Sequence, residues 1–265
     1  MGYECLNLER DEQVAVMTLD RSEKLNALNA VLRKDILNAV AEVREDDDIR
    51  TLVITGTGRG FCSGADLSGS RPEPTETIPQ NQRLDEMSWM GQQALAIGRL
   101  DKPVIAAVNG VAAGAGMSLA LACDLRVGSE KTSFKTVFPE RSLSPDTGMT
   151  FFLPRIIGYS RAIDLIFTSR RVEAEEAYRL GLLDRLVEHD KLMEEAVGLA
   201  KQIAFWPPMA IRSSKRTLQR NMEVDLEQAL RNETMGLSYA RSAPNDMKES
   251  RLSWLEKRPP KFTGQ

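Results

Sequence analysis

One aspartate and two glycine-rich segments have the residue types and spacing that catalysis could use. Asp146 lies in SLSPDTGMTFFLP, after a proline and two residues before a glycine, where aspartate is common in turns. The segments GTGRGFCSG and NGVAAGAG each follow an apolar stretch, and glycine there lets backbone N–H groups approach a ligand. Together they could supply two N–H donors for one developing oxyanion. Asp146 is then either a turn residue or a proton carrier beside them.

Other catalytic arrangements find little support in the sequence. The single histidine, His189, lies between charged residues, so a serine–histidine–aspartate hydrolase or a multi-histidine metal site lacks its residues. Neither glycine segment continues into Gly-Lys-Ser/Thr, and GTGRGF fits a dinucleotide-binding fingerprint poorly because it does not open a helix. The three cysteines are too few and too far apart for a disulfide framework. We therefore expect chemistry that uses carboxylates and backbone groups, without a metal.

Alternating strands and helices are expected to position these residues. Short apolar segments predict strands at 13–19, 51–55, 104–108, 124–127 and 133–137, and helical spacing of apolar residues predicts helices over 26–43 and 84–100. The proline-rich segment 68–82 predicts a surface loop. Beyond it the pattern becomes helical, near 146–157, 160–167, 173–179, 190–205, 208–220, 223–240 and 244–256. The order indicates an α/β core with a helical C-terminal part.

Composition and charge narrow the range of partners. The chain has 265 residues, 42% of them hydrophobic and 28% charged, which is typical of a soluble globular protein. Its net charge of −3 gives no electrostatic footprint for nucleic acid. The N-terminus lacks the pattern of a signal peptide, and no apolar run approaches the roughly 18 residues of a membrane span. We therefore expect a cytoplasmic protein with neither a nucleic-acid nor a membrane partner.

Several blocks of the sequence resemble one enzyme family along essentially the whole chain. The most specific are GRGFCSGADL, KPVIAAVNGVAAGAGMSLALACDLRV and SPDTGMTFFLPRIIG; NALN near the start, EAEEAYRLGLLDRLV, PPMAIRSSK and KRPPKF fit the same pattern. These blocks resemble the enoyl-CoA hydratase/isomerase (crotonase) superfamily. The resemblance implies a crotonase-like α/β fold, in which a spiral of ββα units over residues 1–200 carries the acyl-CoA site. Residues 201–265 would then form a helical trimerisation region.

The resemblance also implies where the thioester of an acyl-CoA substrate would lie. Coenzyme A is then part of the substrate, and no separate cofactor is expected. Two backbone N–H groups, matched here by Ala65 and Ala115, would hold the thioester carbonyl, with a shift of the second donor to Gly114 left open. The substrate-contacting positions around the first donor are Gly64, Asp66 and Leu67. Asp66 is expected to act mainly in structure, beside the first loop.

The segment after the first strand is expected to contact the coenzyme A part of the substrate. By the same resemblance, Lys24 is a phosphate partner, and Ala27 and Leu28 form an apolar lining. A solvated lysine near the start of a helix is the alternative reading of Lys24. The family assembles as trimers or as dimers of trimers, so a homo-oligomer is expected in which the C-terminal helices pack on a neighbour.

One departure from the family pattern bears on the reaction. Hydratases of this family use two glutamates to position and deprotonate water. The matching positions here are Ser118 and Phe138, and Glu140 would match the second position only after a two-residue shift. The two carboxylates that hydration uses are therefore not both in register.

Asp146 is the best-placed carboxylate that remains. In several branches of the superfamily a Pro-Asp-x-Gly motif supplies an aspartate that isomerases use to shuttle a proton. A dehalogenase branch uses it as a nucleophile together with a histidine and a tryptophan, but Phe138 occupies the tryptophan position here. We expect an enoyl-CoA isomerase, in which Ser118 orients Asp146 or a water. An enoyl-CoA hydratase is the first alternative, and a non-catalytic CoA-ester-binding or assembly protein of the same fold is the second.

Overall fold

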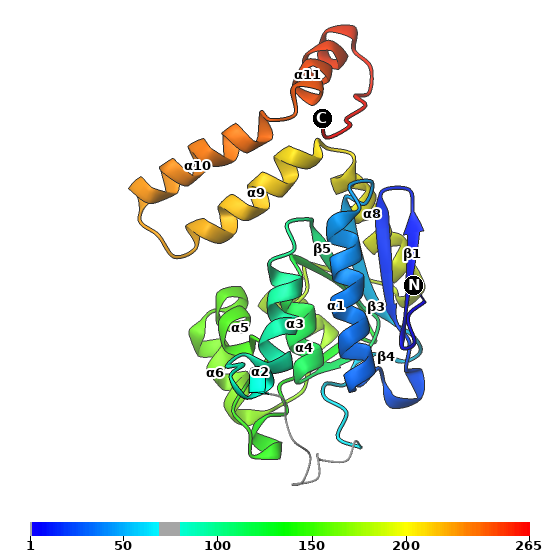
Figure 1. Cartoon of the computed structure of the whole chain (residues 1–265). Helices are drawn as coiled ribbons and strands as arrows, with labels where there is room; N and C mark the ends of the chain where they lie inside the picture. Colours follow the sequence, from blue (N-terminus) through cyan, green and yellow to red (C-terminus); the bar gives the residue numbers. More distant parts are fainter. Residues whose placement is uncertain (1, 69–79) are drawn as a thin grey trace.

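Two β-sheets of unequal size carry the fold in the computed structural model, which describes residues 2–68 and 80–265 (Figure 1). The larger sheet contains, in spatial order, β1 (Leu6–Asp11), β2 (Val14–Leu19), β3 (Thr51–Gly56), β5 (Val104–Val108), β7 (Leu125–Ser129) and β10 (Arg185–Val187). The smaller contains β4 (Gly60–Cys62), β6 (Val111–Ala113), β8 (Ser133–Lys135) and β9 (Val172–Glu173). Most of the loop predicted at 68–82 lies outside the described residues.

From β3 to β8, successive strands alternate between the two sheets, and each pair of strands is followed by a helix. The strand pairs β3–β4, β5–β6 and β7–β8 each place the first strand in the larger sheet and the second in the smaller. Within each sheet these strands pair in parallel. The helices that follow the three pairs include α3 (Ser88–Gly98), α4 (Ala115–Ala122) and α5 (Met149–Ile157). The α/β core predicted from the sequence is therefore confirmed, and its unit is ββα.

The central strands are continuous apolar runs because both of their faces are covered. TLVITG of β3 and VIAAV of β5 are buried at every residue, as is usual for parallel strands between helical layers. One set of their side chains packs in the main core with α1 (Ala30–Glu45), and the alternate set packs against α8 (Leu192–Ala204). Asn29 begins α1, since its side chain accepts a hydrogen bond from the Leu32 N–H.

The remaining helices follow the predicted order closely. They are the short α2 (Gln80–Arg83), then α6 (Tyr159–Thr168), α7 (Ala174–Leu180), α9 (Pro208–Asn221), α10 (Leu226–Ala240) and α11 (Pro244–Glu256). Figure 1 shows α9 and α10 as a helical pair beside the core, with α11 beyond them. Among the described residues, no helix has both the length and the apolar character needed to cross a bilayer.

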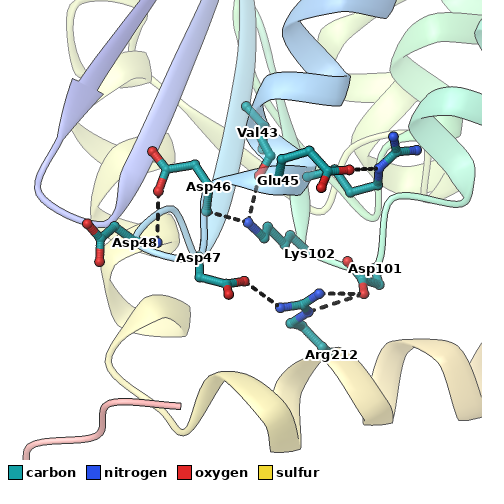
Figure 2. A network of polar contacts seen from close by, with 9 residues as sticks. Val43, Glu45, Asp46, Asp47, Asp48, Asp101, Lys102 and Arg212 are labelled. Atoms are coloured by element: carbon teal, nitrogen blue, oxygen red, sulfur yellow. Dashed lines mark hydrogen bonds and ion pairs between the residues drawn. The ribbon is translucent and has the colours of Figure 1, made fainter. Parts of the chain in front are cut away.

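A buried lysine closes the C-terminal end of α1. Lys102 is 1% exposed, and its ammonium donates to the carbonyl oxygens of Val43 and Asp46, each at 2.6 Å (Figure 2). Burial lowers the pKa of this ammonium group. Near it, Arg212 of α9 contacts the Asp101 carboxylate at 2.9 Å and the Asp47 carboxylate at 3.4 Å. The lysine of the KPVIAAVNG block therefore caps a helix, and the adjacent aspartates anchor α9.

Replacing this lysine should destabilise the protein without touching the glycine loops. Lys102→Met would leave two buried carbonyl groups without their donor, so we expect the free energy of unfolding to fall by about 2–3 kcal/mol. Urea denaturation followed by circular dichroism measures this change. Lys131→Met is the matched control, because Lys131 is exposed and its change should stay within about 0.5 kcal/mol. Equal stability of the two variants would contradict the capping role.

Candidate active site

The first glycine segment brings Ala65 beside the chain that leads into α1. Ala65 and Leu28 form an isolated parallel bridge, in which the Leu28 N–H donates to Gly64 O at 2.8 Å and the Asp66 N–H donates to Leu28 O at 3.2 Å. In such a bridge the N–H of Ala65 itself points away from Leu28. Ala65 is exposed, and its N–H has no backbone acceptor among the described residues. This N–H is available to a ligand.

The second glycine segment ends at the N-terminus of α4. Gly114 caps the helix with φ +50 and ψ −123, and its own N–H donates to Lys135 O at 3.0 Å. Ala115 is the first residue of the helix, so its N–H is one of the donors that no earlier turn can satisfy. The positive end of the helix dipole adds to the field at this point. Ala115, rather than Gly114, is therefore the second available donor.

Gly64 is the point at which the two segments meet. Its φ is +97, and a Cβ at this position would lie 2.8 Å from Ala113 O and 3.5 Å from Ala115 N. Only glycine permits both this conformation and this approach. A similar close approach occurs in the first turn of α4, where a Cβ on Gly116 would clash with Cys62 O. The N–H groups of Ala65 and Ala115 are thus brought together by glycine contacts between backbones.

Two buried asparagines hold the first loop, and the sequence analysis did not identify either one. The Asn26 side chain donates to Gly60 O at 2.8 Å and to Thr57 O at 3.0 Å. Asn109, just after β5, donates to Gly58 O at 3.0 Å and also to Gly60 O at 3.2 Å. Each stands in a short motif, NAL and NG, at the end of an element. An amide side chain that follows a strand or turn in this way was the signal that could have revealed them.

Asp66 is an anchor for the first loop and faces neighbouring protein groups. Its carboxylate accepts from the Arg21 guanidinium at 2.9 Å and from the Ser68 N–H and hydroxyl at 2.9 and 2.6 Å. These Ser68 and Arg21 hydrogen bonds lower the pKa of Asp66 from 3.8 to about 2. Arg21 also donates to the carbonyl oxygen of Ala27. The geometry supports the structural role expected for Asp66, whereas its contact with substrate stays a prediction.

The lowered pKa of Asp66 predicts a specific pH dependence of stability. Because its folded pKa of about 2 lies below the unperturbed 3.8, the stabilisation is present above about pH 4 and is lost as pH falls through about 2. Asp66→Asn should therefore reduce the free energy of unfolding by about 1–3 kcal/mol at pH 7. The difference in the free energy of unfolding between the wild-type protein and Asp66→Asn should become smaller as pH falls. Urea denaturation at several pH values measures it, and a difference that is the same at acid and neutral pH would contradict the assignment.

Asp146 occupies a strained turn directly before α5. Thr147 has φ +51 although it is β-branched and 3% exposed, and Gly148 follows with φ +80. A buried β-branched residue in the left-handed region is uncommon and marks a turn that its surroundings impose. The Thr147 hydroxyl donates to Asp146 Oδ1 at 2.7 Å, and no other hydrogen bond to this half-buried carboxylate occurs within the described parts of the chain. Oδ2 is therefore open to a further partner.

Ser118 connects this turn to the helix that carries Ala115. Ser118 is fully buried, and its hydroxyl donates to the Asp146 carbonyl oxygen at 3.3 Å. Ser118 is three positions after Ala115 in α4, a rise of roughly 4.5 Å along the helix. The backbone of Asp146 thus lies about one helical turn from the second donor. The predicted assistance of Asp146 by Ser118 takes the form of a bond to the main chain.

The other predicted positions divide between the interior and the surface. Ala27 and Leu28 are buried at 7% and 2% exposure, whereas Leu67 is 68% exposed. Lys24 is exposed and leads into this segment, so its ammonium group is free to extend over it. Phe138 is buried in the main core immediately after Val137, whose side chain would contact a Cβ at Gly114. The structure thus brings Leu28, Ala65, Ala115 and the Asp146 turn together.

A family model described as Enoyl-CoA hydratase/isomerase matches residues 9–265, nearly the whole chain. The chain belongs to this family. The enoyl-CoA hydratase/isomerase fold that the sequence predicted is confirmed by solved structures. One is an enoyl-CoA hydratase from Bacillus anthracis, with a TM-score of 0.88 and 31% identity over 99% of this chain and 100% of that one.

The named relatives include both an isomerase and a hydratase. The 1,2-epoxyphenylacetyl-CoA isomerase of Escherichia coli is 34% identical, with 96% of this chain and 97% of the relative covered. The crotonyl-CoA hydratase of Syntrophomonas wolfei is also 34% identical, with 99% of each chain covered. Identity of this size shows an acyl-CoA enzyme of the family and leaves the reaction to the residues of the site.

Neither of the two positions that hydratases use for glutamate carries a carboxylate here. Ser118 carries a hydroxyl that is already used by the Asp146 main chain, and Phe138 has no polar group. Glu140, which a two-residue shift would bring into register, pairs with Lys135 at 2.6 Å, and its side chain is 44% exposed. The ion pair with Lys135 lowers the pKa of Glu140. Since the Asp66 carboxylate is held by Arg21 and Ser68, Asp146 is the carboxylate of the described site that keeps an oxygen open to a substrate.

Proposed function

We propose that this protein is an enoyl-CoA isomerase that moves a carbon–carbon double bond of an acyl-CoA, with Asp146 as the proton shuttle. The observation that carries the proposal is the position of Asp146. It is held by Ser118 of α4, one turn from the Ala115 donor, with an unpaired carboxylate oxygen among the described residues. The name of the E. coli relative, an isomerase, supports the same class of reaction.

The reaction needs one carboxylate and one oxyanion site. The N–H groups of Ala65 and Ala115 would hold the thioester carbonyl oxygen and stabilise negative charge on it as an α proton leaves. The Asp146 carboxylate would take this proton from C2 of a 3-enoyl-CoA, and the electron pair would spread into a dienolate. The neutral carboxylic acid would then return the proton to C4, giving the 2-enoyl-CoA. The reaction consumes no water and uses no cofactor.

Hydration of a 2-enoyl-CoA is the second candidate. The name of the S. wolfei relative, a crotonyl-CoA hydratase, favours it. Against it stand Ser118 and Phe138, since hydration uses two carboxylates to orient and deprotonate water. Asp146 would have to perform both tasks, and we therefore rank hydration below isomerisation.

Two substrates distinguish the reactions. With a trans-3-enoyl-CoA, we expect the absorbance of the conjugated thioester to grow while the mass of the acyl-CoA stays unchanged. With a trans-2-enoyl-CoA, we expect little addition of water by mass spectrometry. Rapid addition of water to the 2-enoyl substrate would overturn the isomerase proposal in favour of hydration. Failure to turn over either substrate, with acyl-CoA binding retained, would overturn both.

We also propose that Lys24 contacts a phosphate of coenzyme A, with Ala27 and Leu28 as the apolar lining beside it. Lys24 is exposed at the start of the segment that ends in the Leu28–Ala65 bridge, so one stretch of chain would span the substrate from phosphate to thioester.

Residues 201–265 are proposed as the region through which copies of the chain assemble into a trimer or a dimer of trimers. The helices of this region expose many large apolar side chains, among them Leu218, Met222, Leu226, Leu230, Leu237 and Trp254. Light scattering after gel filtration should give the mass of three or six chains. A Leu226→Glu/Leu230→Glu variant should lower that mass, whereas Glu233→Gln should leave it unchanged. A monomeric wild-type protein would refute the assembly.

A further inference from the structure

A glutamine lies buried beside the proposed site with no hydrogen-bond partner. Gln93 of α3 is 1% exposed, and neither its Oε1 nor its Nε2 has a partner within the described residues. Buried amide groups are almost always hydrogen-bonded, because burying one without a partner costs free energy. Within the described chain, the other buried side chains without partners, at Ser88, Asp101, Ser133 and Ser169, each leave one oxygen atom unpaired. Gln93 leaves two polar atoms unpaired, its amide nitrogen and its amide oxygen.

The position of Gln93 places it next to the catalytic elements. Trp89, Gln93 and Ile97 follow one another at a spacing of four and lie on the face of α3 that packs on the core. At the start of this face, the Arg33 guanidinium of α1 lies 4.3 Å from the centre of the Trp89 ring. The α3 helix also contacts α4, which carries Ala115 and Ser118. The helix that carries Gln93 therefore packs against both α1 and α4.

Ala94, the residue after Gln93, shows where α3 meets the turn of Asp146. A Cβ on Gly148 would lie 3.4 Å from the Ala94 Cβ, so α3 touches the turn of Asp146 at the residue that follows Gln93. Phe152 fills the space beyond, against Gly98. Gln93 is therefore adjacent in α3 to the residue that meets the Asp146 turn. An acyl chain held at the two donors with its reacting carbons at Asp146 would extend toward α3.

We propose that Gln93 selects an acyl-CoA whose acyl chain carries a hydroxyl group beyond C3, by hydrogen bonding to that hydroxyl. A single hydroxyl can form hydrogen bonds with both unpaired groups, because it accepts from the Nε2 amide while donating to Oε1. An apolar chain would leave both groups unpaired in the complex. The inference rests on the proposed acyl-CoA site, and it concerns which acyl group the site prefers rather than which reaction follows.

The test compares binding of saturated acyl-CoA esters, which the enzyme cannot isomerise. Esters of one chain length, unsubstituted or hydroxylated at successive carbons from C4 onward, are titrated by isothermal calorimetry against the wild-type protein, Gln93→Met and Gln92→Met. We expect at least one hydroxylated ester to bind the wild-type protein about ten- to hundredfold more tightly than the unsubstituted ester. Gln93→Met should remove that preference and tighten binding of the unsubstituted ester.

Gln92→Met is the matched control because it makes the same replacement on the exposed side of the same helix. Gln92 is exposed, and its amide donates to the Asp85 carboxylate at 2.7 Å. This variant should keep the wild-type preference. The preference is a ratio of two affinities measured on one preparation, so a partial loss of folded Gln93→Met protein does not change it. Gln93→Asn keeps the amide group on a shorter side chain and should reduce the preference.

Two results would overturn the inference: no hydroxylated ester binds the wild-type protein more tightly, or the preference survives in Gln93→Met. These outcomes are independent of the reaction. A preference that depends on Gln93 in a protein without isomerase turnover would refute the proposed function and keep this inference. Isomerase turnover without any hydroxyl preference would refute this inference and keep the proposed function.

Discussion

Asp146→Asn is expected to lower kcat for the isomerisation of a 3-enoyl-CoA by about 100- to 10,000-fold, the usual contribution of a positioned acid–base group. The amide cannot take the C2 proton, whereas the turn should persist. Two contacts that define the turn, from the Ser118 hydroxyl and from the Met149 N–H at 2.9 Å, both go to the main-chain carbonyl of Asp146 and not to its carboxylate. The affinity for an unreactive saturated acyl-CoA should therefore change less than about threefold. Steady-state kinetics and calorimetry measure the two effects.

The matched control for this variant is Asp190→Asn, at an exposed aspartate in the short helical turn before α8. It should retain the wild-type kcat. Undiminished turnover in Asp146→Asn would remove Asp146 from the mechanism. Loss of acyl-CoA affinity together with kcat would instead assign it to substrate binding.

Gly64→Ala should abolish most catalysis for a geometric reason. The added Cβ would lie 2.8 Å from Ala113 O, and the residue would keep a φ of +97 that alanine rarely adopts. Because the Cβ would clash with a backbone carbonyl that cannot rotate away, the two loops must separate. The Ala65 and Ala115 donors would then move apart. Removal of one oxyanion donor typically lowers the rate by about 100- to 1000-fold, and we expect kcat to fall by at least that factor.

Gly198→Ala provides the comparison for this second variant. Gly198 lies exposed in α8 with no atom within 4 Å of its added Cβ, so alanine should leave kcat unchanged and stabilise the helix by up to about 1 kcal/mol. If Gly64→Ala retained wild-type kcat and gained stability in the same way, Gly64 would not position the donors. A shift in KM alone would indicate that the loop binds substrate without stabilising the oxyanion.

Short-range patterns in the sequence predicted most of the elements. The runs TLVIT and VIAAV are buried strands, and the helices beyond residue 146 begin and end within about three residues of their predicted limits. The helix predicted from 146 begins at Met149, because Thr147 and Gly148 are both left-handed and form the turn. The strands that were missed, β1, β4, β6, β9 and β10, are polar at an edge or only two or three residues long.

The sequence by itself determined which residues could do chemistry. A single histidine, scattered cysteines and two glycine segments left backbone donors and Asp146, and the absence of glutamate at Ser118 and Phe138 was readable directly. Only the tertiary structure decided how these groups meet. Gly64 lies against Ala113, and Ser118 bonds to the main chain of Asp146. Lys102 caps a helix, and Gln93 is buried with no partner in the described part of the chain. Such contacts join residues tens of positions apart, and a local pattern fixes the periodicity of an element but not the neighbour against which it packs.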